Sequence, residues 1–317
     1  MNVVHRYKMG GAVIASTNEL TEMSAGPRPS PHEPVDLTIT LDESPDPVWL
    51  DDGVVVSSTH DVELRRAGNR FVLDLHDSVM DLSADGRTLR AWASPGLDQS
   101  AFRHALLDVA IPYALSLQGR TVLHATAVAL EGSAVAFIGH SGQGKSTLAA
   151  AVASRADAML LADDCLCVAD LGGTFVVEPS YPGMRLRPDS LHATFGRHGT
   201  TDVGASSKKL IAPSVATYSA ALATVPLVAL VLLDPQNDVC APQLIRLRRA
   251  EAYMAVVRHR LQLDVGEGLH GSLLERFATL VDHVPTFRLR FVPAFESLGE
   301  TVAAVVGAVR DAASSRG

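Results

Sequence analysis

One nine-residue segment constrains this chain more than any other feature. Gly139 to Thr147 read G-H-S-G-Q-G-K-S-T, a complete match to the phosphate-binding pattern G-x-x-x-x-G-K-[ST]. The apolar run Ser133–Ile138 before it predicts a buried strand, and Thr147–Ser154 after it is rich in helix-forming residues. Strand, glycine turn and helix is the context in which this pattern binds phosphate. The sequence therefore predicts a nucleotide site here.

The parts of this segment, which we call the glycine loop, have separate expected roles. Gly142 and Gly144 allow the backbone to wrap closely around phosphate, with N–H groups pointing at the anion. Lys145 is expected to reach the β- and γ-phosphates, and Ser146 to offer its hydroxyl to Mg²⁺. The expected nucleotide-binding residues are Gly139, Ser141, Gly142, Gln143, Gly144, Lys145, Ser146 and Thr147. The alternative is an ordinary glycine turn before a helix, which the correct flanks disfavour.

Composition limits the possible partners. The chain has 317 residues, of which 47% are hydrophobic, enough for a sizeable core in one large domain or two. Its net charge is −8. A broad nucleic-acid surface needs a basic face, so we expect no nucleic-acid partner.

Targeting signals are not visible in the sequence. The longest apolar stretch, Ala220–Leu233, is shorter than a membrane span and carries Pro226, so a buried strand at Leu227–Leu233 explains it better. Three cysteines are an odd and sparse set, which fits a reducing compartment. We therefore expect a cytoplasmic protein without a membrane partner.

The chain divides into two parts by pattern. Residues 1–97 are predicted to be a β-rich N-terminal region that ends near Pro95-Gly96. Residues 98–317 are predicted to be the nucleotide-binding core. The strands expected in the first part are Val35–Leu41, Asp61–Arg66, Arg70–Leu75 and Arg87–Trp92, with a hairpin turn at Ala67-Gly68-Asn69.

The second part alternates strands and helices, which predicts an α/β fold. Ser100–Leu117 has helical spacing, with Ser100 as a possible cap and Pro112 expected to kink or split it. A strand at Thr121–Leu130 is expected to form a hairpin with the strand before the glycine loop, through Glu131-Gly132. Further strands are expected at Ala158–Asp164, Cys165–Ala169, Thr174–Val177, Leu227–Asp234 and Thr286–Phe291, helices at Arg249–Leu263, Ser272–Asp282 and Leu298–Ala313, and a loop at 195–210.

Two adjacent carboxylates follow the glycine loop at the end of a predicted strand. In open α/β sheets ligands bind at the carboxyl ends of strands, so Asp163 and Asp164 are candidate functional residues. One would order Mg²⁺ and the other would accept the proton of an attacking hydroxyl. Neighbouring strand residues point to opposite faces, so the two should differ in role. We assign the metal to Asp163 and the base to Asp164, an assignment that depends on strand register. A turn cap is the alternative.

His124 and a lysine pair complete the candidates. His124 interrupts an otherwise apolar strand, and it is either a hydrogen-bonded core residue or a group that reaches an aspartate or a phosphate oxygen. Lys209, next to Lys208, either supplies a cation to the transferring phosphate or belongs to a solvated loop. Arg185 and Arg187 alternate on an expected strand and should share a face, where they either bind carboxylate or phosphate or are simply exposed.

Four segments together resemble a known family. Leu123–Val128, the glycine loop with its flanks, L-L-A-D-D ending at Asp164, and P-S-Y-P-G-M-R-L-R-P-D-S from Pro179 to Ser190 are similar to HPr kinase/phosphorylase-like proteins. Their order and spacing look closest to the precursor-peptide serine kinases of lasso-peptide biosynthesis. The resemblance implies a P-loop kinase core of HPr kinase type, with His124 on the strand before the loop and a catalytic Asp pair. The arginine-rich signature of the bacterial HPr kinases is absent, so neither phosphorylase activity nor HPr itself is implied.

The leading hypothesis is a kinase that transfers a phosphoryl group from ATP, or from GTP, to a serine of a peptide, with Mg²⁺ as cofactor. The resemblance makes a lasso-type precursor the expected peptide. The alternatives are a kinase of a small hydroxylated metabolite and a non-catalytic nucleotide-binding regulator. A switch GTPase would carry an N-K-x-D motif, which the sequence lacks. A homo-oligomer remains open.

Overall fold

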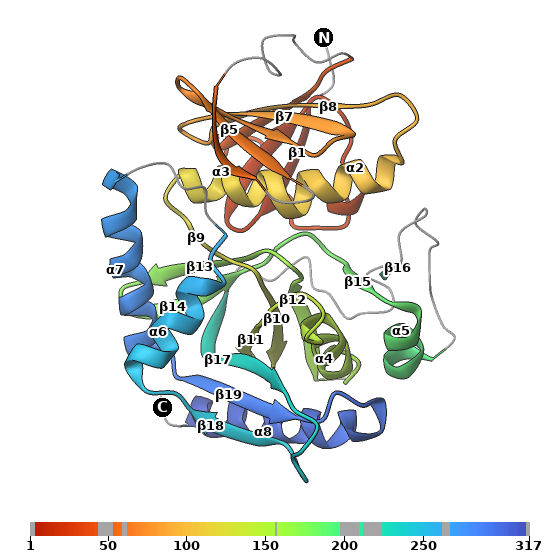
Figure 1. The fold of residues 1–317 in the computed structure, drawn as a ribbon, viewed down its shortest axis with the longest axis vertical. Helices are drawn as coiled ribbons and strands as arrows, with labels where there is room; N and C mark the ends of the chain where they lie inside the picture. Colours follow the sequence, from red (N-terminus) through yellow and green to blue (C-terminus); the bar gives the residue numbers. More distant parts are fainter. Residues whose placement is uncertain are drawn as a thin grey trace.

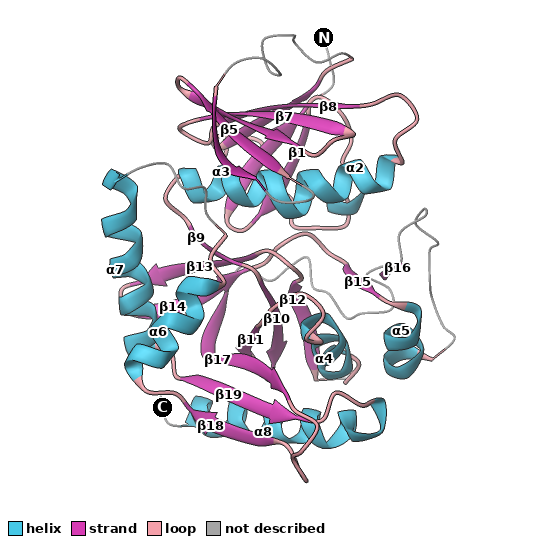
Figure 2. Cartoon of the chain, in the orientation of Figure 1, coloured by secondary structure: helices cyan, strands magenta, loops and turns pink. Residues whose placement is uncertain are grey.

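Two large β-sheets with a helical layer between them make up the computed structural model of this chain (Figures 1 and 2). The structure describes residues 4–43, 53–58, 62–155, 157–196, 209–211, 224–261 and 267–314, with the backbone alone for 209–211 and 267–270. Sheets and helices in one chain agree with the α/β class predicted from the sequence. No helix in these ranges is long and apolar enough to cross a membrane.

The N-terminal sheet has the strand order β1-β2-β3-β8-β7-β6-β5-β4. Its strands are β1 His5–Met9, β2 Ala12–Ser16, β3 Leu37–Leu41, β4 Val54–Ser58, β5 Glu63–Ala67, β6 Arg70–Asp74, β7 Ser78–Ser83 and β8 Thr88–Ala93. The predicted hairpin at Ala67-Gly68-Asn69 is confirmed, with Gly68 at φ +57°. The β1–β2 hairpin, β4 and β7 were not predicted.

A buried helical layer separates the two sheets (Figure 1). It consists of α2 Gln99–Ala105, a π-helical turn Leu106–Ala110 and α3 Ile111–Leu117 in direct succession. The predicted split of this helix near Pro112 is confirmed, because a π-helical turn interrupts the α-helix directly before it. Pro112 lies in the first turn of α3, where a missing N–H is tolerated, and the wider turn precedes it. The cap is Asp98, whose carboxylate accepts from the Ser100 N–H, and not Ser100.

The second sheet follows the order β12-β10-β11-β17-β14-β13-β9, with β19 and β18 added beyond β17. Its strands are β9 Thr121–Leu123, β10 Ala125–Leu130, β11 Ser133–Ile138, β12 Ala158–Ala162, β13 Leu166–Leu171, β14 Thr174–Glu178, β17 Val225–Pro235, β18 Gln243–Arg246 and β19 Thr286–Phe291. The Glu131-Gly132 hairpin is confirmed. Strands β11, β17 and β19 run parallel, so their carboxyl ends meet at one edge.

Helices cover both faces of this second sheet. One face packs against α4 Lys145–Ala153 and α8 Leu298–Ser314, and the other against α6 Arg249–Arg258 and α7 Glu267–His283. Alternate strand residues serve the two faces: Val135 and Phe137 contact the α4 side, while Ala134 and Ala136 contact the α6 side. Layers of this kind bury the sheet and leave its strand ends accessible.

Several predicted boundaries were wrong. The strand predicted at Thr121–Leu130 breaks at His124 into β9 and β10, which pair with different strands. The helix from Arg249 ends at Arg258 and does not reach Leu263. Helix α5 Pro188–Phe195 was missed, and it follows the short strand β15 Met184–Leu186. Of the predicted 195–210 loop, residues 197–208 lie outside the described ranges, while residues 209–211 form β16 beside β15.

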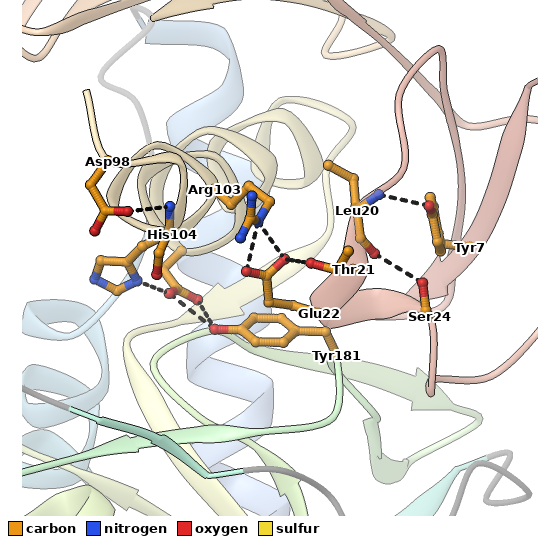
Figure 3. Close-up of polar contacts among 11 residues, drawn as sticks. Tyr7, Leu20, Thr21, Glu22, Ser24, Asp98, Arg103, His104 and Tyr181 are labelled. Atoms are coloured by element: carbon orange, nitrogen blue, oxygen red, sulfur yellow. Dashed lines mark hydrogen bonds and ion pairs between the residues drawn. The ribbon is translucent and has the colours of Figure 1, made fainter. Parts of the chain in front are cut away.

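A polar network joins the helical layer to the segment that leads into β15 (Figure 3). The Tyr181 hydroxyl donates to both carboxylate oxygens of Asp108, at 2.8 and 3.0 Å. The His104 Nδ1 atom contacts the same carboxylate, and Arg103 donates to Glu22 at 2.8 Å. Burial, with the Asp108 charge, raises the pKa of Tyr181 well above its usual value, so Tyr181 remains a donor.

Replacing Tyr181 with phenylalanine is expected to destabilise the protein by about 1–3 kcal/mol. The change removes a donor from Asp108, a carboxylate only 9% exposed, and an unmet buried acceptor is costly. The measurement is the free energy of unfolding in urea. Tyr113→Phe is the matched control, because the structure describes no hydrogen bond for that half-buried hydroxyl. Equal stability of Tyr181→Phe and wild type would contradict the expectation.

Candidate active site

The glycine loop has the backbone that its sequence predicts. Gly144 caps α4 with φ +92°, and Gly142 has φ +84°, both in the left-handed region that favours glycine. A Cβ added at either position would meet no atom within 4 Å, so the space over the loop is open. The Gln143 side-chain oxygen accepts from the His140 N–H at 2.6 Å and closes the loop on itself.

This open space is a cavity of about 390 Å³. Polar residues of the glycine loop from Ser141 to Thr147 form one wall, together with Asp164. An apolar wall comes from β19 and the segment after it. Its large side chains are Phe291, Pro293, Phe295 and Leu298. A polar floor beside an apolar wall suits a ligand with a charged part and an apolar part, such as a nucleotide.

Lys145 is buried against the loop that carries it. Its ammonium group, 5% exposed as a residue, donates to the Gly139 carbonyl at 2.8 Å and to the His140 carbonyl at 3.3 Å. The His124 Nε2 atom lies 3.0 Å from the same ammonium nitrogen. These contacts hold the ammonium group at the glycine loop, and Lys145 lines the cavity there.

His124 connects Lys145 to the Asp pair. Its Nδ1 atom lies 3.2 Å from the Asp164 carbonyl oxygen, which can only accept. Because the Lys145 ammonium can only donate, Nε2 must accept and Nδ1 must carry the proton, so the ring is neutral. The strand breaks here because the His124 N–H donates to the carbonyl of His259, 2.7 Å away, and not to a neighbouring strand.

Asp163 is fixed from three directions. Its Oδ1 accepts from the Thr126 hydroxyl at 2.8 Å and the Ser146 hydroxyl at 2.9 Å, and its Oδ2 accepts from the Arg185 N–H at 3.0 Å. The residue is 3% exposed. Burial, and then the neighbouring Asp164 carboxylate, raise the pKa of Asp163 to about 7. A cation held beside it would favour its ionised form.

Asp164 differs from Asp163 in backbone and exposure. Strand β12 ends at Ala162, short of the Asp164 end predicted, and Asp164 has φ +58°. This left-handed residue is half-buried and lines the cavity with Ser146. The turn, more than strand alternation, sends the two side chains to different places.

The pair Ser146 and Asp163 fits Mg²⁺. The Ser146 hydroxyl, in the first turn of α4, lines the cavity and donates to the Asp163 carboxylate buried behind it. Among the described residues, no three His, Cys, Asp or Glu side chains gather around one point. Mg²⁺ suits such a sparse set because it keeps several waters and takes further oxygens from phosphates.

The other cationic residues predicted for the site, two lysines and two arginines, lie in different surroundings. Lys208 lies outside the described residues, and of Lys209 only the backbone is described, opposite Leu186 in the β15–β16 pair. Arg185 and Arg187 both line the cavity, which agrees with the predicted shared face, but they differ in burial. Arg185 is 4% exposed on β15, while Arg187 is exposed at the start of α5.

His259, at the end of α6, is a site residue that the sequence reasoning missed. Its ring meets the His140 ring edge to face at 5.2 Å, and its carbonyl holds His124. Burial lowers the pKa of His259 to about 4, and the nearby Lys145 and Arg258 side chains add to this. No motif marks it, since it is far from the glycine loop in sequence.

The low pKa of His259 gives an expected pH dependence. Between pH 6.5 and 4, His259 is protonated in the unfolded chain but not in the folded protein. The free energy of unfolding should therefore fall as the pH falls through this window. We expect a loss of about 1–2 kcal/mol between pH 7.5 and pH 5, because this range crosses only part of the window and solvent screens part of the shift. Urea unfolding at pH 7.5 and pH 5 measures it. His259→Gln should reduce the loss and the exposed His192→Gln should not; equal losses in all three would contradict the assignment.

Comparisons with known proteins add little to this geometry. No family model and no curated protein matches the chain. Among solved structures, the chain is similar to the Hpr(Ser) kinase/phosphatase from Coxiella burnetii, at 12% sequence identity and a TM-score of 0.33. The match covers 60% of this chain and 97% of that chain. A likeness at this level does not determine function.

Proposed function

We propose that this protein is an ATP-dependent kinase that phosphorylates a serine hydroxyl of a peptide. One observation carries the proposal. His124 links the Lys145 ammonium to the backbone of Asp164, and Lys145, Ser146 and Asp164 line one cavity with the glycine loop. A cation for phosphate, a metal-binding hydroxyl and a carboxylate base are the parts that phosphoryl transfer needs.

The reaction would use these groups as follows. The serine oxygen attacks the γ-phosphorus, the bond from that phosphorus to the β–γ bridging oxygen breaks, and ADP leaves. The hydroxyl proton passes to the Asp164 carboxylate. Lys145 and the loop N–H groups stabilise the negative charge that moves onto the leaving oxygen. Ser146, with Asp163 behind it, would hold Mg²⁺, which would supply further positive charge beside the phosphate oxygens.

The nature of the acceptor rests on different observations. The resemblance of residues 121–190 to precursor-peptide kinases favours a peptide, with a lasso-type precursor as the first candidate. GTP could replace ATP, because the side chains of Phe291, Pro293 and Phe295 in the apolar wall have no hydrogen-bonding groups that would distinguish guanine from adenine.

The test is incubation with γ-labelled ATP, Mg²⁺ and serine-containing peptides, including precursor peptides encoded near the gene. We expect label on serine and a mass increase of one phosphate. The control is the same peptide with that serine replaced by alanine, which should take no label. Label on a small hydroxylated compound alone would favour a metabolite kinase, and tight nucleotide binding without any transfer would favour a regulator.

A further inference from the structure

Arg185 is a buried cation without an evident counter-charge. Its residue is 4% exposed, and neither Nε nor Nη2 has a hydrogen-bond partner in the part of the chain that the structure describes. No carboxylate in those ranges forms an ion pair with it. Its backbone is well fixed, because its N–H donates to Asp163. The unpartnered atoms within the described residues are therefore the side-chain Nε and Nη2.

A guanidinium in this state points to a ligand. Buried arginines are normally paired, since an uncompensated buried charge is strongly destabilising. The two unpartnered nitrogens lie on the same edge of the planar group. That edge forms two parallel hydrogen bonds to a phosphate or a carboxylate. Arg185 and the glycine loop line the same cavity, so an anion bound in that cavity would lie near Arg185.

The position of Arg185 in the chain indicates which anion it would bind. The Asp163 carboxylate joins its backbone to the Ser146 hydroxyl, at 3.0 and 2.9 Å. Ser146 is the loop residue expected beside Mg²⁺, where the β- and γ-phosphates meet. Asp164, the proposed base, follows Asp163 in the chain and lines the same cavity. The backbone of Arg185 is therefore joined through Asp163 to the residue expected beside Mg²⁺, and Arg185 lines the cavity in which the phosphates would bind.

We infer that Arg185 binds the terminal phosphate of the nucleotide through its Nε and Nη2 atoms, and so makes the site selective for a triphosphate over a diphosphate. This inference rests on the proposed function. The same contact would stabilise charge on the phosphoryl group during transfer. The chain thus carries its own arginine for this role.

The structure offers a matched control. Arg187 lies two residues along, lines the same cavity and is exposed, so its charge is solvated without a ligand. Arg185→Met keeps the backbone N–H bond to Asp163 and similar side-chain length while removing the charge. Arg185→Lys keeps the charge but loses the two-pronged edge.

The test is calorimetric binding of Mg²⁺-ADP and of a non-hydrolysable Mg²⁺-ATP analogue to the intact protein. In Arg185→Met we expect the affinity for the analogue to fall about 10- to 100-fold, with ADP affinity nearly unchanged. Arg185→Lys should lose most of the preference, and Arg187→Met should keep it. Without ligand, Arg185→Met should melt at a higher temperature than wild type, because a buried charge is removed.

The outcomes separate the two proposals. Wild type that binds neither nucleotide would overturn the proposed function and, with it, this role. Wild type that prefers the triphosphate, with Arg185→Met preferring it equally, would overturn only the role of Arg185. Equal losses for ADP and the analogue in Arg185→Met would also overturn it, since they would reflect general damage to the site. A rise in peptide KM alone would assign Arg185 to the acceptor and contradict the inference.

Discussion

Replacing Lys145 with alanine is expected to abolish phosphoryl transfer, with a loss of about 10³-fold or more in turnover. The ammonium group is the cation of the glycine loop, and neutral acceptors hold it close to the cavity. Alanine leaves the charge that develops on the phosphates without this partner. The measurement is transfer from γ-labelled ATP to the peptide, with folding checked by circular dichroism and by the melting temperature.

A second variant separates charge from positioning. His124→Gln removes the ring that lies between Lys145 and the Asp164 carbonyl, and leaves the Lys145 charge in place. We expect it to lower turnover less than Lys145→Ala does. A well-folded Lys145→Ala protein with near-normal turnover would show that the kinase proposal is wrong.

Features that are local in sequence were the ones that sequence reasoning could predict. The glycine loop carries its own backbone constraints in Gly142 and Gly144, and the residues on both sides specify its strand and helix. The Glu131-Gly132 hairpin was predictable for the same reason, because a two-residue turn fixes the register of its strands.

Features that depend on tertiary contacts could not be predicted from the sequence. The break at His124 arises because its N–H pairs with His259, a residue from a distant helix. The burial of Arg185, beside an exposed Arg187, depends on the layers packed around β15, and a period-two pattern does not predict it. Local spacing also could not show that the helix at residues 99–117 is covered on both sides, by one sheet and by the other.

The Asp pair combines both situations. Its place after the glycine loop could be predicted from the sequence. The separation of roles, however, comes from the left-handed turn at Asp164, which the spacing of apolar residues does not predict. Because Asp163 accepts three hydrogen bonds behind Ser146, and Asp164 lines the cavity, the two carboxylates offer a direct experimental comparison.

Asp164→Asn is expected to keep nucleotide affinity and lose transfer. Asparagine tolerates the left-handed backbone at this position, so the turn should survive. It cannot take the hydroxyl proton, and loss of a general base lowers turnover by about 10²- to 10⁴-fold. The measurements are the nucleotide Kd by calorimetry and peptide phosphorylation by mass.

Asp163→Asn is the matched comparison, since it makes the same replacement, a carboxylate by an amide, at the neighbouring residue. It should raise the Mg²⁺ concentration needed for nucleotide binding, because its carboxylate fixes Ser146 and adds charge to the metal site. Asp164→Asn should leave that concentration unchanged. Equal effects of the two variants on nucleotide binding would refute this division of roles, and an Asp164→Asn protein that still phosphorylates the peptide at the wild-type rate would remove Asp164 as the base.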